Sequence, residues 1–353
     1  MSRFLADRFA MLDAYVPGEQ PSDMGYIKLN TNEMPFPPPH TVTDEVKAEL
    51  EKLHLYPNPD GFKLIKNLAE FFEVKPENIM IGNGSDELLA FSFLAFFENG
   101  VVFPDITYGF YPVYANLYNV PYQEIPLRDD LTIDPDDYIA TGKNVVIANP
   151  NAPTGIALKP ADIEKIAQSN RDHVILIDEA YIDFGGESVI PLTKKYDNML
   201  VIHTYSKSRS MAGARLGFAV GSAPLIEDLN KMKYSFNPYN VNRLTQIMGA
   251  AALDNDEFYI IKRQEIIKAR EYTAKKLEKL NFVLTDSKAN FLFCKHPDIS
   301  GCELYSMLKD KGILVRQWEK PRISNYIRIT IGTVEQMDAL LAAVEEIITG
   351  RAL

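Results

Sequence analysis

The sequence has few cysteines and histidines, and this scarcity limits the chemistry available to the protein. Two cysteines, Cys294 and Cys302, occur in 353 residues. They are too few for a disulfide framework, and we expect both to be reduced. The five histidines show none of the paired spacings that zinc ligands adopt. The sequence therefore predicts neither a disulfide-stabilised protein nor a metal centre.

Long apolar runs and an excess of positive charge are also missing. The longest apolar stretch, 91–97, is far shorter than the ~20 residues that cross a membrane. Near the amino terminus, Asp7 and Arg8 interrupt the apolar core that a signal peptide needs. With 37 Lys and Arg against 48 Asp and Glu, the net charge of -11 disfavours nucleic acid as a partner. We expect a cytoplasmic protein that binds neither membranes nor nucleic acid.

Short β-rich runs alternate with amphipathic stretches from residue 79 onward. This alternation is typical of an α/β domain with a mostly parallel sheet flanked by helices. Seven strands are predicted, in 79–81, 100–103, 121–125, 144–148, 174–177, 199–204 and 216–220. The last two lie too close together for a parallel crossover. One strand of the seven should therefore be antiparallel.

Two further parts of the chain flank this region. Residues 254–280 are predicted to form one long polar helix. Four strands follow it, in 281–284, 290–294, 312–316 and 326–330. The first 40 residues contain several prolines and little periodicity, which indicates a short opening helix and then an extended arm. We expect an arm (1–40), a large α/β domain (41–253) and a smaller α+β domain (254–353).

Polar and charged residues directly follow several predicted strands of the large sheet. They lie in Gly82-Asn-Gly-Ser-Asp86, Asn149-Pro-Asn-Ala-Pro-Thr-Gly155, Asp178-Glu-Ala-Tyr181 and Ser206-Lys207, and in Arg215, which opens the antiparallel strand. Doubly wound sheets bind ligands at the carboxyl ends of their strands. Each segment alone has an ordinary structural explanation, such as a helix cap at Asp178. Their combination on adjacent strand ends instead predicts an active site.

This set of residues matches the requirements of catalysis with pyridoxal 5'-phosphate. Lys207 can form a Schiff base with the cofactor, and Asp178 can keep the pyridine nitrogen protonated so that the ring accepts electrons. Backbone N–H groups after Gly84, at the start of a helix, attract a dianion. The Ser206 hydroxyl and the Arg215 guanidinium complete a phosphate socket. The sequence therefore predicts pyridoxal 5'-phosphate as the cofactor.

Through these segments the sequence resembles the fold type I aminotransferases, and within them the histidinol-phosphate aminotransferases. The second resemblance is carried by Lys28-Leu-Asn-Thr-Asn-Glu33, Tyr56-Pro, Gly82-Asn-Gly-Ser-Asp-Glu87, Pro238-Tyr-Asn-Val-Asn242 and Tyr326-Ile-Arg-Ile-Thr-Ile-Gly-Thr333. It spans nearly the whole chain. It implies a transaminase that moves an amino group between L-histidinol phosphate and 2-oxoglutarate or glutamate in histidine biosynthesis.

The resemblance also implies roles for individual residues. Lys207 binds the cofactor and transfers the proton, and Asp178 pairs with the ring nitrogen. Asn151 and Tyr181 hold the phenolic oxygen, and Tyr108 stacks on the ring. The phosphate socket comprises Gly84, Ser85, Asp86, Ser206, Arg215 and, from a second subunit, Tyr56.

For the small-molecule substrate, the resemblance points to Arg316 and Arg328 on two strands of the small domain. The two arginines supply the cations that a substrate phosphate needs. Tyr15 of the arm closes over the substrate, and Asn151 lies beside it. Because Tyr56 is expected to act in the neighbouring subunit, we expect a homodimer with shared active sites.

Three departures from the family's pattern bear on substrate preference. They are Met34, Ala152 and the segment 208–211, in which Arg209 adds a charge near the pocket. An aromatic amino acid aminotransferase or a decarboxylase of phosphorylated amino acids would use the same cofactor-binding residues, so both remain alternatives. A cofactor-sensing transcription factor is disfavoured because the arm is too short for a DNA-binding module. A purely structural role would not explain polar groups collected at strand ends.

Overall fold

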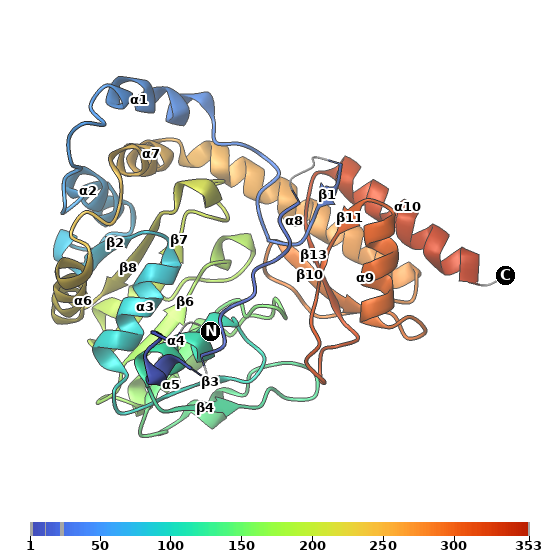
Figure 1. Cartoon of the computed structure of the whole chain (residues 1–353), viewed down its shortest axis with the longest axis horizontal. Helices are drawn as coiled ribbons and strands as arrows, with labels where there is room; N and C mark the ends of the chain where they lie inside the picture. The colour runs from blue at the N-terminus through green and yellow to red at the C-terminus, as the bar shows by residue number, and fades with distance from the viewer. Residues whose placement is uncertain (1–2, 11, 22–24, 352–353) are drawn as a thin grey trace.

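The computed structural model describes residues 3–10, 12–21 and 25–351 (Figure 1). The described strands form a seven-stranded sheet, a four-stranded sheet and a two-stranded sheet. In Figure 1 the large sheet and its helices lie on the left, and the four-stranded sheet lies on the right with α9 and α10. None of the described helices is both long and apolar enough to cross a membrane.

The large sheet has the strand order β2-β8-β7-β6-β5-β3-β4. Its strands are β2 (Ile79–Gly82), β3 (Val101–Pro104), β4 (Tyr122–Ile125), β5 (Asn144–Ala148), β6 (Ile175–Asp178), β7 (Met199–Thr204) and β8 (Gly217–Gly221). Strand β8 is antiparallel to both of its neighbours, and the other pairs are parallel. The predicted α/β fold, with one antiparallel strand among seven, is confirmed.

All strands of this sheet except the edge strand β4 are buried along their whole length, because helices cover both faces. Successive side chains of a strand point to opposite faces, so Val145 and Val146 belong to different core clusters. The first cluster includes residues of α2 (Phe62–Phe71), α5 (Pro160–Ser169) and α7 (Arg243–Asp254). The second includes residues of α3 (Ser85–Phe96), α4 (Phe110–Tyr118) and α6 (Ala223–Phe236). Only the strand ends remain available to a ligand.

The carboxyl-terminal part of the chain builds a second sheet with its own core. The helix predicted over 254–280 is confirmed as α8 (Asp256–Lys279). Antiparallel strands β12 (Arg316–Gln317), β13 (Ile327–Thr330), β10 (Phe291–Lys295) and β9 (Val283–Leu284) follow one another across the sheet. Residues of α8, α9 (Gly301–Asp310) and α10 (Val334–Arg351) share the core cluster of this sheet.

The prediction of one strand over 312–316 is wrong, because the segment divides between two sheets. Its first half, β11 (Ile313–Leu314), pairs in parallel with β1 (Ile27–Lys28) of the arm, whereas its last residue opens β12. The predicted opening helix is reduced to a 3-10 turn over Asp7–Phe9. Residues 1–2, 11 and 22–24 of the arm lie outside the described residues.

The arm connects the two larger sheets. In Figure 1 it runs, in blue, from the amino terminus beside α4 to β1 beside the four-stranded sheet, and the chain then continues to α1 (His40–Leu50). The arm also reaches the strand ends where the predicted site lies, because the Thr31 carbonyl accepts a hydrogen bond from Lys207 after β7.

Candidate active site

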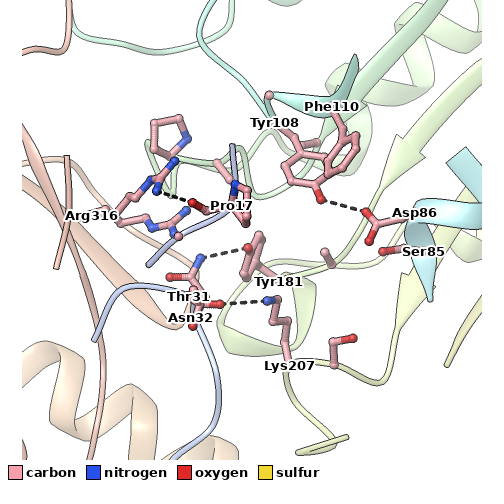
Figure 2. Close-up of a pocket in the computed structure, with 18 of the residues that line it drawn as sticks. Pro17, Thr31, Asn32, Ser85, Asp86, Tyr108, Phe110, Tyr181, Lys207 and Arg316 are labelled. Atoms are coloured by element: carbon pink, nitrogen blue, oxygen red, sulfur yellow. Dashed lines mark hydrogen bonds between the residues drawn. The ribbon is translucent and has the colours of Figure 1, made fainter. Parts of the chain in front are cut away.

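A cavity of about 550 Å³ lies where the arm, the large sheet and the four-stranded sheet meet (Figure 2). The predicted site residues in its wall are Tyr15, Ser85, Asp86, Tyr108, Asp178, Tyr181, Ser206, Lys207, Arg215, Arg316 and Arg328. They come from strand ends, the first turn of α3, the arm and the second sheet. The structure therefore brings residues from widely separated segments into one cavity.

Lys207 enters the cavity from the loop that follows β7 (Figure 2). Its Nζ donates a hydrogen bond to the backbone carbonyl of Thr31 in the arm, at 3.2 Å. The same Nζ lies 5.7 Å from the centre of the Tyr181 ring. A neutral backbone acceptor and an aromatic face thus hold the amine in the cavity, where a carbonyl compound can reach it.

Asp178 ends β6 and is only 4% exposed. Its Oδ1 accepts from the backbone N–H of Ala180 at 3.1 Å, and its Oδ2 accepts from the Tyr111 hydroxyl at 3.0 Å. Burial raises the pKa of Asp178 to about 6, although the two hydrogen bonds act against this rise. A protonated ring nitrogen in the cavity would supply the positive charge that keeps this carboxyl ionised.

The expected phosphate socket lies at the amino terminus of α3, beside Arg215. Gly84 precedes the helix with a φ of 78°, and a Cβ there would lie 2.5 Å from the Arg215 Nη2. A Cβ on Gly217 would lie 2.6 Å from the backbone nitrogen of Ser85. Glycine is therefore required at both positions for the helix, β8 and the guanidinium to approach one another. Arg215 also donates to Asp86 Oδ2 at 2.9 Å. The first backbone N–H groups of α3 and the Arg215 cation thus lie next to each other, which is an arrangement suited to a phosphate.

Tyrosines frame the cavity on two sides (Figure 2). The Tyr108 hydroxyl donates to Asp86 Oδ1 at 2.8 Å. Burial and the negative charge of Asp86 raise the pKa of Tyr108, so its hydroxyl stays neutral. On the other side, the Tyr181 hydroxyl accepts a hydrogen bond from the Asn32 Nδ2 at 2.9 Å. The arm therefore orients Tyr181 as well as Lys207.

Two arginines face the cavity from paired positions on β12 and β13. Arg316 donates to the backbone carbonyls of Val16 and Pro17 in the arm, at 3.0 and 3.1 Å. Arg328 donates to the carbonyl of Asn30 at 3.0 Å, and its Nε is buried without a hydrogen-bond partner in the described chain. Among the described residues, neither guanidinium forms an ion pair with a carboxylate. The cavity therefore presents two cations that an anionic ligand can neutralise.

Asn151 and Tyr56 lie outside the cavity wall. The Asn151 amide is buried, and it donates to the backbone carbonyl of Ile106 at 2.9 Å and to the Thr154 hydroxyl at 3.2 Å. Tyr56 is 76% exposed and stacks on Tyr239 with ring centres 4.5 Å apart. The cofactor contacts expected of both residues stay predictions.

Several cavity residues were not singled out from the sequence. They are Thr31, Asn32, Phe110, Trp318 and Lys320. Thr31 and Asn32 lie in the segment 28–33, so their place in that motif was an available signal. Trp318 and Lys320 follow β12 in a loop without a motif. Only the folded chain identifies them as cavity residues.

The three departures from the family's pattern lie in different surroundings. Ala152 lines the cavity, Met34 packs against the core of the second sheet, and Arg209 does not line the cavity. The Arg209 guanidinium lies 5.3–5.6 Å from the ring centres of Phe71, Tyr205 and Tyr259. It also donates to the Ala252 carbonyl at 3.1 Å and pairs with Asp256 at 2.9 Å. Arg209 thus adds no charge to the cavity wall, because these contacts hold its guanidinium against other parts of the chain.

The chain is similar to aminotransferases along nearly its whole length. Residues 25–344 match the family described as "Aminotransferase class I and II". The chain belongs to the class I and II aminotransferase family. This aminotransferase is 49% identical to the histidinol-phosphate aminotransferase of Brachyspira hyodysenteriae, with 99% of each chain covered. It is 45% identical to the histidinol-phosphate aminotransferase of Clostridium acetobutylicum, with 99% of this chain and 100% of the relative covered.

Solved structures share its fold. The histidinol-phosphate aminotransferase from Sinorhizobium meliloti in complex with pyridoxal-5'-phosphate has a TM-score of 0.88 and 21% identity. That similarity covers 99% of this chain and 100% of the other. Family membership confirms the predicted transaminase class and its cofactor, pyridoxal 5'-phosphate. The cavity fits that cofactor, because it combines a lysine amine, a buried carboxyl that needs a cation, and a cradle of backbone N–H groups.

Proposed function

We propose that this aminotransferase moves an amino group between L-histidinol phosphate and 2-oxoglutarate or glutamate, in histidine biosynthesis. Relatives named histidinol-phosphate aminotransferase, at 44–49% identity over nearly the full chain, support this substrate. The observation that carries it is the pair Arg316 and Arg328, two cations without carboxylate partners in the described chain that line the same cavity as Lys207. A phosphate on the substrate would provide the missing anion.

The residues of the cavity would divide the work as follows. Bound pyridoxal 5'-phosphate supplies an electron sink for the negative charge that develops on the substrate carbon. The Lys207 amine holds the cofactor and moves the proton at that carbon. Asp178 would keep a proton on the ring nitrogen, and Tyr108 would pack against the ring. The amino terminus of α3 and Arg215 hold the cofactor's phosphate.

The arm would close the cavity over the substrate. Tyr15 stacks on Phe110 with ring centres 4.1 Å apart. The two residues that follow, Val16 and Pro17, accept hydrogen bonds from Arg316. The arm is thus tied to a substrate-binding residue, and its presence keeps water away from the reacting carbon.

Labelling tests the assignment of Lys207. Borohydride reduction of the purified yellow enzyme should fix the cofactor to the peptide that contains Lys207 and remove the visible absorption band. A label on any other lysine would overturn the assignment.

A panel of amino donors tests the substrate. Single-turnover spectra with L-histidinol phosphate, unphosphorylated histidinol, phenylalanine, tyrosine and threonine phosphate should show the fastest conversion of the cofactor with L-histidinol phosphate. A faster reaction with phenylalanine or tyrosine would favour the aromatic aminotransferase alternative. Release of carbon dioxide from threonine phosphate would favour the decarboxylase.

We further propose a homodimer with shared active sites. Tyr56 points to solvent, and other apolar side chains nearby in sequence are also exposed, namely Leu50, Leu53, Leu55 and Phe62. An isologous interface over this surface would cover them and place each Tyr56 beside the partner's cavity.

Mixing two inactive variants tests this arrangement. Lys207→Ala removes the reactive amine, and Tyr56→Asp places a negative charge against the cofactor's phosphate. In a mixed dimer, the site on the chain that keeps Lys207 receives an intact Tyr56 from the other chain. Activity should therefore reappear in proportion to the mixed dimers. If mixed dimers form and remain inactive, the shared-site proposal is wrong.

We also propose the division of the chain into an arm (1–40), a large domain (41–253) and a small domain (254–353). The second boundary falls at the last residue of α7, just before α8. Leu292 and Cys294 of β10 belong to the core cluster of α9 and α10, whereas Phe293 packs in the cluster of the large sheet. The pairing of β1 with β11 ties the arm to the small domain.

A further inference from the structure

Tyr111 is a fully buried tyrosine whose hydroxyl contacts the Asp178 carboxyl. Its side chain is 0% exposed, and its hydroxyl donates to Asp178 Oδ2 at 3.0 Å. It lies in the first turn of α4 and is not part of the cavity wall. Any influence of this hydroxyl on a molecule in the cavity must therefore pass through Asp178.

The Tyr111 ring is held in place by other aromatic rings. It stacks on Phe93 with centres 6.3 Å apart and lies 5.8 Å from Phe103. Its edge meets Tyr108, with ring centres 5.7 Å apart and an angle of 84°. Such packing leaves the ring little freedom, so the direction of its hydroxyl is determined before any ligand binds. The same ring supports Tyr108, the residue expected to stack on the cofactor.

The hydrogen bond from Tyr111 favours the ionised form of Asp178. Each carboxyl oxygen accepts one hydrogen bond from the chain, one from Tyr111 and the other from the backbone of Ala180. Both lower the pKa of Asp178, and so does the charge of His203, whereas burial and the charge of Asp86 raise it. Burial and the Asp178 charge raise the pKa of Tyr111, so its hydroxyl keeps its proton and remains a donor.

We propose that Tyr111 is a positioning residue that keeps the Asp178 carboxylate ionised and aimed at the ring nitrogen of the cofactor. The proposal rests on the proposed role of Asp178. Without the hydroxyl, the buried Oδ2 would have no hydrogen-bond donor in place of water. The ionised carboxylate would then be less stable, and the proton between Asp178 and the ring nitrogen would move toward Asp178. A less protonated ring withdraws fewer electrons from the substrate carbon. The Tyr111 hydroxyl would thus increase the rate of proton removal without touching the substrate.

The substitution Tyr111→Phe tests this role, because it removes the hydroxyl and keeps the ring. Because the substitution removes a hydrogen bond to a charged group, we expect kcat to fall about 10- to 100-fold. The KM for L-histidinol phosphate should change less than threefold, since Arg316 and Arg328 are untouched. With pyridoxal phosphate labelled with 15N in the ring, the chemical shift of the ring nitrogen should move toward its deprotonated value. A merely structural role would not move that shift.

A second buried tyrosine provides the matched control. Tyr138 is 1% exposed, and its hydroxyl has no hydrogen-bond partner in the described chain. Tyr138→Phe should leave both kcat and the 15N shift at their wild-type values. An unchanged shift and an unchanged kcat in Tyr111→Phe would overturn the proposal.

Two further variants make the test conclusive. Asp178→Asn should move the 15N shift further than Tyr111→Phe does; if it leaves the shift unchanged, the proposed role of Asp178 is wrong. If Asp178→Asn moves the shift and Tyr111→Phe does not, only the role of Tyr111 is wrong. Site-specific 3-fluorotyrosine at position 111, a stronger donor, should move the shift in the opposite direction. That last measurement decides the question even if Tyr111→Phe does not fold.

Discussion

Arg209 follows Lys207 by two residues and Arg328 lines the cavity, but the two arginines differ in the groups that neutralise their charges. Arg209 has Asp256, the Ala252 carbonyl and three aromatic rings around its guanidinium. Arg328 also lies 5.2–5.3 Å from the ring centres of Phe291 and Trp318, but it donates to one backbone carbonyl and keeps its Nε buried without a hydrogen-bond partner in the described chain. A desolvated charge with a partner in the chain supports the fold. One whose partner must come from outside is available for binding.

The same contrast occurs between two neighbouring carboxyls. Glu179 accepts hydrogen bonds from His203, the Ser188 hydroxyl and the Val189 backbone, at 2.5–2.6 Å. Burial lowers the pKa of His203, but its bond to Glu179 outweighs this, so the pKa is raised overall. Asp178, one residue earlier, faces the cavity with a raised pKa. Successive side chains of a strand point to opposite faces, so Glu179 contacts neighbouring parts of the chain and Asp178 contacts the cavity.

The sharpest test of this contrast is Arg328→Gln, for which we expect the largest effect. Loss of charge-assisted hydrogen bonds to a desolvated phosphate should raise the KM for L-histidinol phosphate roughly 100- to 1000-fold. The free energy of unfolding should not fall, because the native protein loses no ion pair. Steady-state kinetics and urea denaturation measure the two quantities. An equal rise in KM for unphosphorylated histidinol would show that Arg328 binds something other than the phosphate.

Arg209→Gln should show the reverse pattern. Removing one partner of a buried ion pair should lower the free energy of unfolding by about 3–4 kcal/mol. Arg263, 3.7 Å from Asp256, remains as a weaker partner. The KM for L-histidinol phosphate should stay within threefold of wild type. If urea denaturation gives equal stability for Arg209→Gln and Arg328→Gln, the distinction between the two arginines fails.

Asp178→Asn should stabilise the cofactor-free protein above pH 6. The pKa of Asp178 is about 6 in the folded protein and 3.8 without its environment, so the folded state binds more protons between these values. The loss of folding free energy that the buried Asp178 carboxylate causes is absent below pH 3.8 and reaches its full size above pH 6. At about 1.4 kcal/mol per pH unit, the variant should gain roughly 2–3 kcal/mol at pH 7.5. Urea denaturation at pH 7.5 and pH 4.5 measures the gain, which should shrink at the lower pH; a constant gain would contradict this reasoning.

Arg316→Gln should have the smallest effect of the four. Its guanidinium is already bonded to two carbonyls of the arm, so it gains less from a phosphate than Arg328 does. We expect a rise of about tenfold in the KM for L-histidinol phosphate, in the range of one hydrogen bond to a charged group. A rise as large as that in Arg328→Gln would show that the two cations act as one unit.

Much of the fold could be predicted because its signals are local. Each buried strand is a short apolar run, and the few residues between 204 and 216 exclude a parallel crossover, which identifies β8 as antiparallel. The strand ends then bring Asp178, Tyr181 and Lys207 to one edge of the sheet. The prediction for 312–316 is wrong because a local signal does not specify which strands pair. Nothing in that apolar run shows that its two halves pair with different strands.

The sequence by itself determined the order of the strands along the chain, the cluster of polar residues at their ends and the enzyme class. Only the tertiary structure decided which charged side chains pair with other groups of the chain and which face the cavity. Arg209 turns away from the cavity because Phe71, Tyr259 and Asp256, all distant in sequence, surround it. Tyr111 reaches Asp178 across 67 positions for the same reason. Side-chain direction depends on the packing of separate segments, which periodicity within one segment does not encode.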